Sequence, residues 1–372
     1  MTYKWRGTAL FHDDEEAEAD NQPDWLIAFA NGTNGPGRYA YASNSDRTSW
    51  TSADYVTSNR NATFVAAVGK NGAGNGIFVI GQKMTSPNNT HELAVSGEDI
   101  TDGNTWTEVS LVGVANNSNT IQRILWSEDS TSSTSGVWLA GSNSGKVFRS
   151  TDGAANWTEL TTGASDLPGT WGSGDVIGMT ANGSGEWVMA QSSRLFKSTN
   201  NGATFTEISH GISNVSKFLG VIYTNNSYVV VYDRDDDNEV YLRSAADSDL
   251  TTWSNEINFN GIQEPGTAGQ IENVRLAADA SGRVVFISPD RTAVGFVDVN
   301  GTNTSNNTVV GLAVKAARDI ATDGNGTWLV TCEEGEIFES TNNGATWAKI
   351  VDSFPAADCN INCIASNYYL PL

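Results

Sequence analysis

The sequence is poor in cysteine and histidine, and it has no long apolar run. Its 372 residues include 3 Cys and 3 His. So few cysteines cannot form the disulfide framework of a small secreted protein, and we expect Cys332, Cys359 and Cys363 to be core thiols. No stretch approaches the roughly 18 consecutive apolar residues of a transmembrane helix, so we expect no insertion into a membrane.

Basic residues are also scarce. Lys and Arg total 21 against 43 Asp and Glu, which gives a formal net charge of −22. Such a surface repels the phosphates of nucleic acids and anionic lipids, so we exclude nucleic acid as a partner. The acidic run at 13–16 arrives too early for a secretory signal, which predicts synthesis in a cytoplasm.

Turn-forming and aromatic residues are plentiful instead. The chain holds 37 Gly and 12 Trp, and 39% of its residues are hydrophobic. This composition favours an all-β protein with many turns and excludes disorder, because the apolar residues suffice for a core. No long segment has the 3.6-residue period of an amphipathic helix, so we expect almost no helix.

One short pattern recurs along the chain, at 150–157, 198–205 and 340–347. Each copy begins with Ser, has Asp or Asn two places later and ends on an aromatic residue. Alternating apolar runs flank it, and two such runs joined by Gly, Asn or Asp indicate a β-hairpin. We expect these residues to be structural: Ser150, Asp152, Trp157, Ser198, Asn200, Gly202, Phe205, Ser340, Asn342, Gly344 and Trp347. Weaker copies lie at 43–50, 99–106, 244–253 and 298–301.

An apolar strand precedes each copy, and we count seven such strands. They are 24–28, 77–80, 137–140, 187–190, 228–231, 284–287 and 328–331. Together with a further strand before each and the hairpin after it, every unit has four antiparallel strands, the size of a propeller blade. The sequence therefore predicts an all-β, seven-bladed β-propeller that forms a single domain over 1–372. Residues 359–367 look like the first strand of a unit, so we expect them to pair beside the N-terminal strands and close the ring.

The pattern S-x-[DN]-x-G-x-T-[WF] resembles the Asp-box, or BNR repeat, of sialidases, sortilin-type receptors and photosystem II assembly-factor propellers. In those families the box lies at the periphery of a blade, away from the active centre. The resemblance thus implies a propeller fold and a structural role for the box, and it leaves the activity open because one fold serves many functions.

A sialidase- or glycosidase-like enzyme is one alternative. A sialidase-like site would need three Arg around a substrate carboxylate, a Tyr nucleophile with a Glu partner, and an Asp acid/base. The first unit lacks an Arg-Ile-Pro motif, and no carboxylate pair stands out. The available arginines are Arg38, Arg123, Arg149, Arg194, Arg234, Arg275, Arg291 and Arg318. A second alternative, a photosystem assembly-factor-like binder, would need a basic patch, which the net charge disfavours.

A candidate calcium loop begins at Asp233, Asp235 and Asp237. The Gly and Glu that such a loop needs at its sixth and twelfth positions are replaced by Asn238 and Ser244, so a solvated hairpin tip is the favoured interpretation. We expect no cofactor other than this candidate Ca²⁺.

Surface recognition is the remaining interpretation, because variable loops on a rigid frame commonly carry binding. The loops after each second strand should gather on one face of the disc. In the longest, a candidate contact region comprises Lys83, Met84, Asn88 and His91. Our leading hypothesis is a non-enzymatic propeller in the tail or capsid surface of a bacteriophage virion, made in the host cytoplasm. Its partners would be other virion proteins or a host-surface glycan or protein.

Overall fold

Strands dominate the part of the chain that the structure describes. The computed structural model describes residues 4–6, 9–11, 23–31, 36–59, 63–82, 93–101, 106–111, 120–128, 136–163, 166–234, 239–263, 274–288, 294–299, 304–305, 316–352, 354 and 359–367. Within these ranges the one helical element is the short 3₁₀ turn η3 (Glu333–Gly335), as the missing helical periodicity predicts. A search of the same residues finds no helix with the length and hydropathy needed to cross a membrane.

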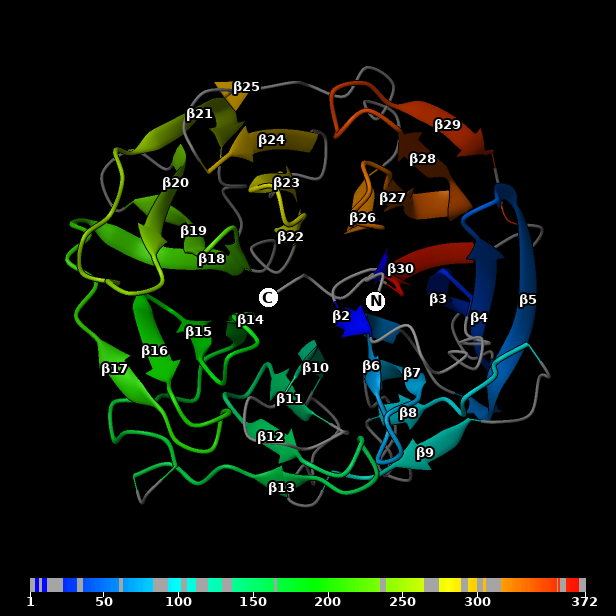
Figure 1. The fold of residues 1–372 in the computed structure, drawn as a ribbon, viewed down its shortest axis with the longest axis horizontal. Coiled ribbons are helices and arrows are strands. Elements are labelled where there is room, and N and C mark those ends of the chain that lie inside the picture. The colour runs from blue at the N-terminus through cyan, green and yellow to red at the C-terminus, as the bar shows by residue number, and fades with distance from the viewer. Residues whose placement is uncertain are drawn as a thin grey trace.

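Seven four-stranded antiparallel sheets surround a central axis (Figure 1), which confirms the predicted seven-bladed propeller. We number the blades in ring order. Blade 1 contains β30 (Cys359–Ser366), β3 (Trp25–Asn31), β4 (Pro36–Ser43) and β5 (Asp46–Asn59). Blade 2 contains β6 (Thr63–Lys70), β7 (Gly76–Gln82), β8 (Leu93–Val95) and β9 (Thr107–Val109). Blade 3 contains β10 (Ile121–Ser127), β11 (Val137–Ser142), β12 (Val147–Ser150) and β13 (Thr158–Glu159).

The remaining blades follow the same order from the axis outward. Blade 4 contains β14 (Val176–Ala181), β15 (Trp187–Gln191), β16 (Arg194–Ser198) and β17 (Thr206–Ile208). Blade 5 contains β18 (Val215–Thr224), β19 (Ser227–Arg234), β20 (Glu239–Ala246) and β21 (Ile257–Gln263). Blade 6 contains β22 (Arg275–Ala278), β23 (Arg283–Ile287), β24 (Val294–Asp298) and β25 (Thr304–Ser305). Blade 7 contains β26 (Ala317–Thr322), β27 (Trp328–Cys332), β28 (Ile337–Ser340) and β29 (Ala348–Val351).

The ring closes through β30, which is the innermost strand of blade 1. It runs antiparallel to β3, from the pair Trp25–Ser366 to the pair Asn31–Cys359. This confirms the expectation for residues 359–367. A separate two-stranded hairpin is formed by β1 (Lys4–Arg6) and β2 (Ala9–Phe11).

Large aromatic side chains occupy the first or second position of several second strands. Trp25, Trp138, Trp187 and Trp328 are fully buried there. Each belongs to an apolar cluster shared with the preceding blade, so the core lies between blades rather than within one. Second strands such as β15 are buried along their whole length, because neighbouring sheets cover both faces.

The antiparallel order assigns every connection to one of two faces. Connections between first and second strands, here called inner turns, and those between third and fourth strands, here called outer turns, lie on the turn face. Connections between second and third strands lie on the opposite loop face, as predicted. This follows from the strand order within each sheet.

The outer turns at 150–157, 198–205 and 340–347, here called serine turns, share one hydrogen-bond network. In blade 4, the buried Ser198 hydroxyl donates to Asn200 Oδ1 (2.9 Å) and accepts from the Gly202 amide (3.0 Å). Asn200 Oδ1 also accepts from the Thr204 amide (3.0 Å). The equivalent bonds join Ser150, Asp152, Ala154 and Asn156, and Ser340, Asn342, Gly344 and Thr346.

The aromatic residue at the end of a serine turn fastens the turn from the other side. Trp157 Nε1 donates to the Ala154 carbonyl and Trp347 Nε1 to the Gly344 carbonyl, both at 3.0 Å. In blade 4 the backbone amide of Phe205 bonds the Asp166 carbonyl instead (2.7 Å). Gly202 has φ of +69° and lies against Leu139 of blade 3, so both its backbone and its surroundings favour glycine.

Cationic side chains tie successive blades together at the outer turns. Arg149 Nε donates to the Asn201 carbonyl of the next blade (3.0 Å), and Lys197 Nζ to the Asp247 carbonyl (3.3 Å). Arg149 and Lys197 each directly precede the Ser of a serine turn in the sequence. Their bonds show that this position makes contacts between blades.

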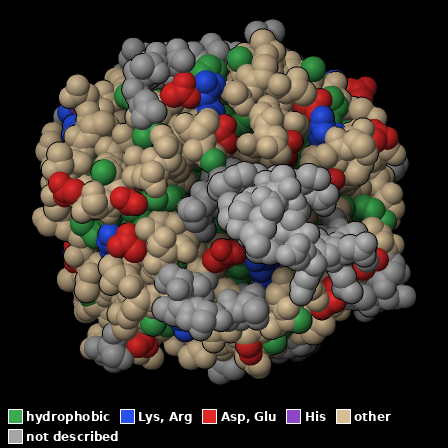
Figure 2. Space-filling view, in the orientation of Figure 1, with side chains coloured by type: hydrophobic (Ala, Val, Ile, Leu, Met, Phe, Trp, Pro, Cys, Tyr) green, Lys and Arg blue, Asp and Glu red, His purple; other side chains and the backbone are tan. Residues whose placement is uncertain are grey.

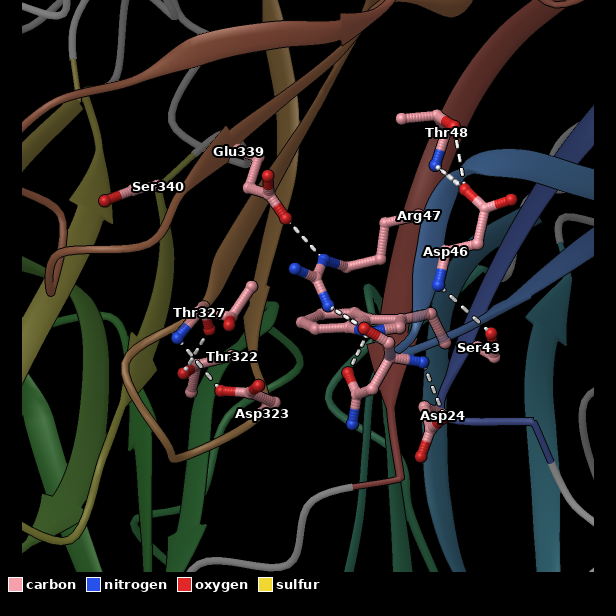
Figure 3. Close-up of polar contacts among 12 residues, drawn as sticks. Asp24, Ser43, Asp46, Arg47, Thr48, Thr322, Asp323, Thr327, Glu339 and Ser340 are labelled. Atoms are coloured by element: carbon pink, nitrogen blue, oxygen red, sulfur yellow. Dashed lines mark hydrogen bonds and ion pairs between the residues drawn. The ribbon is translucent and has the colours of Figure 1, made fainter.

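At the closing seam between blades 7 and 1, the position before the serine turn carries an acceptor instead of a cationic donor (Figure 3). There Glu339 holds the position of Arg149, and it accepts a hydrogen bond from Arg47 on the outer turn of blade 1, 292 positions away. Arg47 also donates to the Asn44 carbonyl. Asp24 accepts from the Asn44 amide (2.6 Å), which joins the seam to the start of β3.

Replacing Ser198 by Ala should destabilise the fold by about 1–2 kcal/mol, because the Gly202 amide and Asn200 lose a buried partner. Urea unfolding followed by Trp fluorescence measures this change. The exposed Ser213, in the connection between blades 4 and 5, is the matched control, and its replacement by Ala should leave the midpoint unchanged. Equal midpoints for both variants would contradict a structural role for the serine turn.

Candidate functional site

A cavity lies on the axis where the innermost strands end at the turn face. Its volume is about 220 Å³, and all seven innermost strands line it. Alanine is the commonest residue of the lining, and hydroxyl side chains supply most of its polar atoms. The lining residues are Ala66, Ala67, Val68, Ile124, Leu125, Trp126, Ser127, Thr180, Ala181, Ile222, Ala277, Ala278, Ile320, Ala321, Thr322, Ala365 and Ser366.

A ring of equivalent positions surrounds the deep end of this axial cavity. The strand registers place these positions at one level. Each lies opposite the residue three places after an equivalent large apolar residue of the second strand, namely Trp25, Ile77, Trp138, Trp187, Tyr228, Val284 or Trp328. Three members are charged and the other four are small, which leaves room for long side chains at the axis. The ring, here called the axial ring, consists of Ala66, Arg123, Gly178, Gly220, Arg275, Asp319 and Cys363.

Asp319 is the best-defined member of the axial ring. Its carboxylate accepts from the Ile320 and Ile364 amides, both at 3.0 Å, and lies 3.6 Å from Arg275 Nε. Ile364 belongs to β30 and Asp319 to blade 7. Asp319 therefore has a structural role, because it bonds the strand that closes the ring to blade 7. Burial raises the pKa of Asp319, against the opposing influence of Arg275 and of the two amides.

Arg123 also lies close enough to Asp319 to favour its ionised form. Arg123 belongs to blade 3 and Asp319 to blade 7, which lie on opposite sides of the ring. The Arg123 side chain therefore extends toward the axis, where its NH1 group donates to the Gln122 carbonyl (2.8 Å). Two arginines and one carboxylate therefore meet at the axis.

The structure brings only this pair of the candidate arginines together. Arg38 pairs with Asp54, Arg194 with Glu207, and Arg318 with Glu333. Arg149 contacts the next outer turn, as described above, and Arg234 lies in blade 5. Arg291 lies outside the described residues. A convergence of three arginines is therefore not found among the described candidates.

A Tyr–Glu pair does occur, but in the middle of blade 5. The Tyr232 hydroxyl donates to Glu256, and Arg243 Nε donates to Tyr232 Oη (3.0 Å). Arg234 NH1 donates to the other Glu256 oxygen (3.1 Å), and its guanidinium lies 4.9 Å from the centre of the Tyr241 ring. Tyr232 is fully buried, and burial and the Glu256 contact raise its pKa. The cluster is a cross-link between β19, β20 and the segment before β21.

The other candidate residues lie mostly outside the described part of the chain. Asp233 is buried at the end of β19, whereas Asp235 and Asp237 are outside the described ranges. A search of the described residues finds no group of three or more His, Cys, Asp or Glu side chains placed to hold a metal ion. The contact-loop residues Lys83, Met84, Asn88 and His91 are also outside the described ranges.

Four inner turns share a pattern that the sequence interpretation missed. Each starts with Asn or Asp, whose Oδ1 accepts from the amides two and four places later, and each has a glycine with positive φ three places later. For Asp323 these bonds are 2.8 Å to the Asn325 amide and 3.0 Å to the Thr327 amide. The pattern [DN]-x-x-G-x was the available signal. Its copies begin at Asn71, Asn182, Asp279 and Asp323.

Three of the outer turns with weaker copies of the pattern are held by a different set of hydrogen bonds. Asp46, Asp99 and Asp249 each accept from the amide and hydroxyl of the Thr two places later. These bonds to Thr251 lower the pKa of Asp249 to about 2. An Asp-x-Thr turn thus replaces the serine turn in blades 1, 2 and 5.

Comparisons with known proteins show the fold alone. The sequence matches no protein-family model and no curated protein. One similar solved structure is YCF48 bound to D1 peptide, with 13% identity, a TM-score of 0.52, and 83% of this chain and 86% of that chain covered. Another is Saccharomyces cerevisiae Sqt1, with 9% identity, a TM-score of 0.56 and coverage of 89% and 83%. A chain of the mitotic checkpoint complex has 10% identity, a TM-score of 0.54 and coverage of 98% and 91%.

Replacing Asp319 or Asp249 by Asn should alter the pH dependence of stability in opposite directions. The raised pKa of Asp319 means that the folded protein holds its proton more tightly than the unfolded chain does. Its contribution to stability is present at low pH and is lost as the pH rises above about 4. The lowered pKa of Asp249 gives a contribution that is present above about 4 and is lost as the pH falls toward 2.

Urea unfolding between acid and neutral pH measures both effects. Relative to wild type, the Asp319→Asn variant should gain stability as the pH rises through this range, and the Asp249→Asn variant should lose it. Parallel stability curves for the wild type and both variants would show that neither carboxyl group is perturbed in the folded protein.

Proposed function

We propose that this protein is a non-enzymatic propeller that binds a partner protein and takes an extended segment of that partner into the axial cavity. The observation that carries the proposal is the cavity itself. It is open to narrow chains because alanines line it, and the hydroxyl groups of Ser127, Thr180 and Ser366 in its wall each make one bond to the protein's own backbone and keep further hydrogen-bonding capacity. Sites of this kind combine an apolar wall with a few polar groups that fix orientation.

The axial ring suggests which part of a partner would enter. Arg123 and Arg275 place two cations beside Asp319 at the deep end. Arg pairs well with carboxylates, so these cations would attract an Asp or Glu side chain or a terminal carboxylate. The favoured ligand is therefore an extended peptide with one anionic group among small residues.

The distribution of charge over the surface agrees with selective rather than general attraction. Figure 2 shows Asp and Glu side chains scattered over the visible face, with Lys and Arg between them. A strongly acidic protein repels most acidic partners at long range. The anionic group of a partner would thus be accepted at the axis and not on the rim.

Similar propellers lend this proposal support of a limited kind. YCF48 has been solved bound to D1 peptide, and a related fold occurs in the mitotic checkpoint complex. Those are properties of the named proteins. The shared architecture makes peptide binding by this chain a reasonable first test, since fold alone does not fix function.

The proposal that the protein is not an enzyme rests on the separation of the two groups that a sialidase-like site would need. The arginine pair lies on the axis, whereas Tyr232 is fully buried in blade 5 and bonds the partly exposed Glu256 of the same blade. A substrate cannot contact both. Turnover of fluorogenic sialosides or glycosides by the purified protein, lost on mutation of Tyr232 or Arg275, would instead support the enzyme alternative.

For the biological setting we propose the tail or capsid surface of a bacteriophage virion, with another virion protein or a host-surface protein or glycan as partner. The support is the composition, because the chain is rich in small polar residues and poor in Lys and Arg. Mass spectrometry of purified particles should detect this protein in a fixed ratio to the major capsid protein. Its absence from the particles would reject this setting but leave the peptide-binding proposal intact.

Peptides selected from a displayed random library on the wild-type protein should bind in the axial cavity. Replacing Ala277 by Trp fills the cavity and should weaken the binding of such peptides by about tenfold or more. The Arg275→Gln variant should weaken chiefly the peptides with an acidic residue. The matched control is Thr206→Trp on the exposed outer strand of blade 4, which should bind as wild type does; equal binding by all variants would place the peptide elsewhere.

A further inference from the structure

The connection between blades 4 and 5 contains His210, the one histidine within the described residues. Residues 209–214 lead from β17, the outermost strand of blade 4, to β18, the innermost strand of blade 5. This connection lies on the loop face, because β17 ends there and β18 begins there. The His210 side chain is half-buried in it.

Both ring nitrogens of His210 have a backbone partner. Nδ1 accepts a hydrogen bond from the Ile212 amide (3.1 Å), and Nε2 lies 3.2 Å from the Ser193 carbonyl oxygen. A backbone amide can only donate, so Nδ1 carries no proton in this arrangement. The proton of the neutral ring is therefore on Nε2, which donates it to the Ser193 carbonyl.

These bonds connect two neighbouring blades. Ser193 belongs to the turn between β15 and β16 of blade 4, and the adjacent Ser192 carbonyl accepts from the Phe218 amide of β18 (2.8 Å). The His210 ring meets the Phe218 ring edge to face, with the ring centres 5.2 Å apart. The Ile212 side chain is buried in the apolar cluster that blades 4 and 5 share. His210 thus holds Ile212 in place at the interface between the blades.

A proton on Nδ1 would disrupt this arrangement. Nδ1 would change from an acceptor into a second donor that faces the Ile212 amide, and a half-buried ring beside Phe218 would become charged. Burial lowers the pKa of His210, against the opposing influence of the Ser193 carbonyl and of Glu207. Geometry and burial therefore both favour the neutral ring.

The charged groups on the elements packed around the ring are few. Glu207 of β17 favours the protonated ring, but its carboxylate also lies 3.7 Å from Arg194 Nε of β16. Lys217 is the one charged residue of β18, and it directly precedes Phe218, so strand alternation directs it to the other face of the sheet. The rest of the connection and the turn between β15 and β16 contain no charged residue.

We propose that His210 is a pH-sensitive latch between blades 4 and 5. The neutral ring holds residues 209–214 in place, and its protonation in mildly acidic solution releases them and uncovers Ile212. The strands of both blades stay paired, so the opening is local. This latch does not depend on the proposed peptide binding, because it lies on the loop face and the axial cavity lies at the turn face.

The direction of the pH effect follows from the lowered pKa of His210. The folded protein holds this proton less tightly than the unfolded chain does. The contribution of the latch to stability is therefore present above the ordinary histidine pKa of about 6.5, and it is lost as the pH falls below that value.

Hydrogen exchange measures the latch in the full chain. Between about pH 7.5 and about pH 5, the protection factor of residues 209–214, corrected for the intrinsic effect of pH, should fall by about fivefold or more. The inner turn that starts at Asn182 is the internal reference, because its Ser184 and Glu186 amides bond a side chain that does not titrate. Its protection should stay the same.

Two variants separate the titration from the fold. His210→Asn keeps an acceptor for the amide two places later, as Asn71 and Asn182 do in their own turns, and it cannot be protonated. Protection of residues 209–214 should therefore be high at both pH values in this variant. His210→Ala removes the acceptor, and protection should be low at both pH values.

Nitrogen NMR of histidine-labelled protein gives a second readout. The signals of His210 are those that disappear in the His210→Asn variant, and at neutral pH they should show a proton on Nε2 and none on Nδ1. A proton on Nδ1 at neutral pH would overturn the latch. So would wild-type protection that does not change with pH, an equal loss in His210→Asn, or full protection in His210→Ala.

Discussion

Packing between neighbouring blades is the constraint on which the rest of the structure depends. Each second strand carries large apolar residues that are buried against the preceding blade, with Trp138 and Trp187 as examples. A row of such blades would always leave one uncovered face at each end. Closure of the ring removes both faces, and β30 provides it by pairing with β3. Two contacts then hold the seam between blades 7 and 1: Asp319 near the axis and the Arg47–Glu339 pair at the outer edge of the disc.

The fold could be predicted from the sequence because its signals are local. Ser198, Asn200 and Phe205 lie within eight residues, and their spacing alone specifies the turn that the structure shows. The apolar runs of the second strands are equally local signals, and so is the resemblance of residues 359–367 to the first strand of a unit. These signals repeat along the chain, so weak copies were supported by strong ones, as in other repeat architectures.

The candidate site could be predicted only in part, because it is assembled across blades. Arg123, Arg275 and Asp319 occupy the same level only after strand register and a bulge in most innermost strands are known. No spacing in the sequence relates Arg123 to Asp319. The Tyr232–Glu256 contact likewise joins a strand to a segment 24 positions later, and Tyr232 is fully buried. The sequence interpretation took the Asp-x-Thr outer turns for weaker copies of the serine turn. They hold the same connection between third and fourth strands, but an Asp bonded to a Thr replaces the Ser that anchors a serine turn.

The same closure links the fold to its proposed function. Blade 1 is built from both ends of the described chain, so the axial cavity has a rim at which two segments leave the ring. A partner segment in the axial cavity would therefore contact the one blade whose first and second strands are not covalently joined by a turn.

Removal of residues 359–372 tests the central claim most directly, with scanning calorimetry of the full and shortened chains as the measurement. We predict that the shortened chain loses the single cooperative transition of the full chain, because every blade depends on a closed ring, and that a synthetic peptide of residues 359–372 restores it. A shortened chain that keeps the transition temperature of the full chain would contradict the claim that β30 closes and stabilises the propeller.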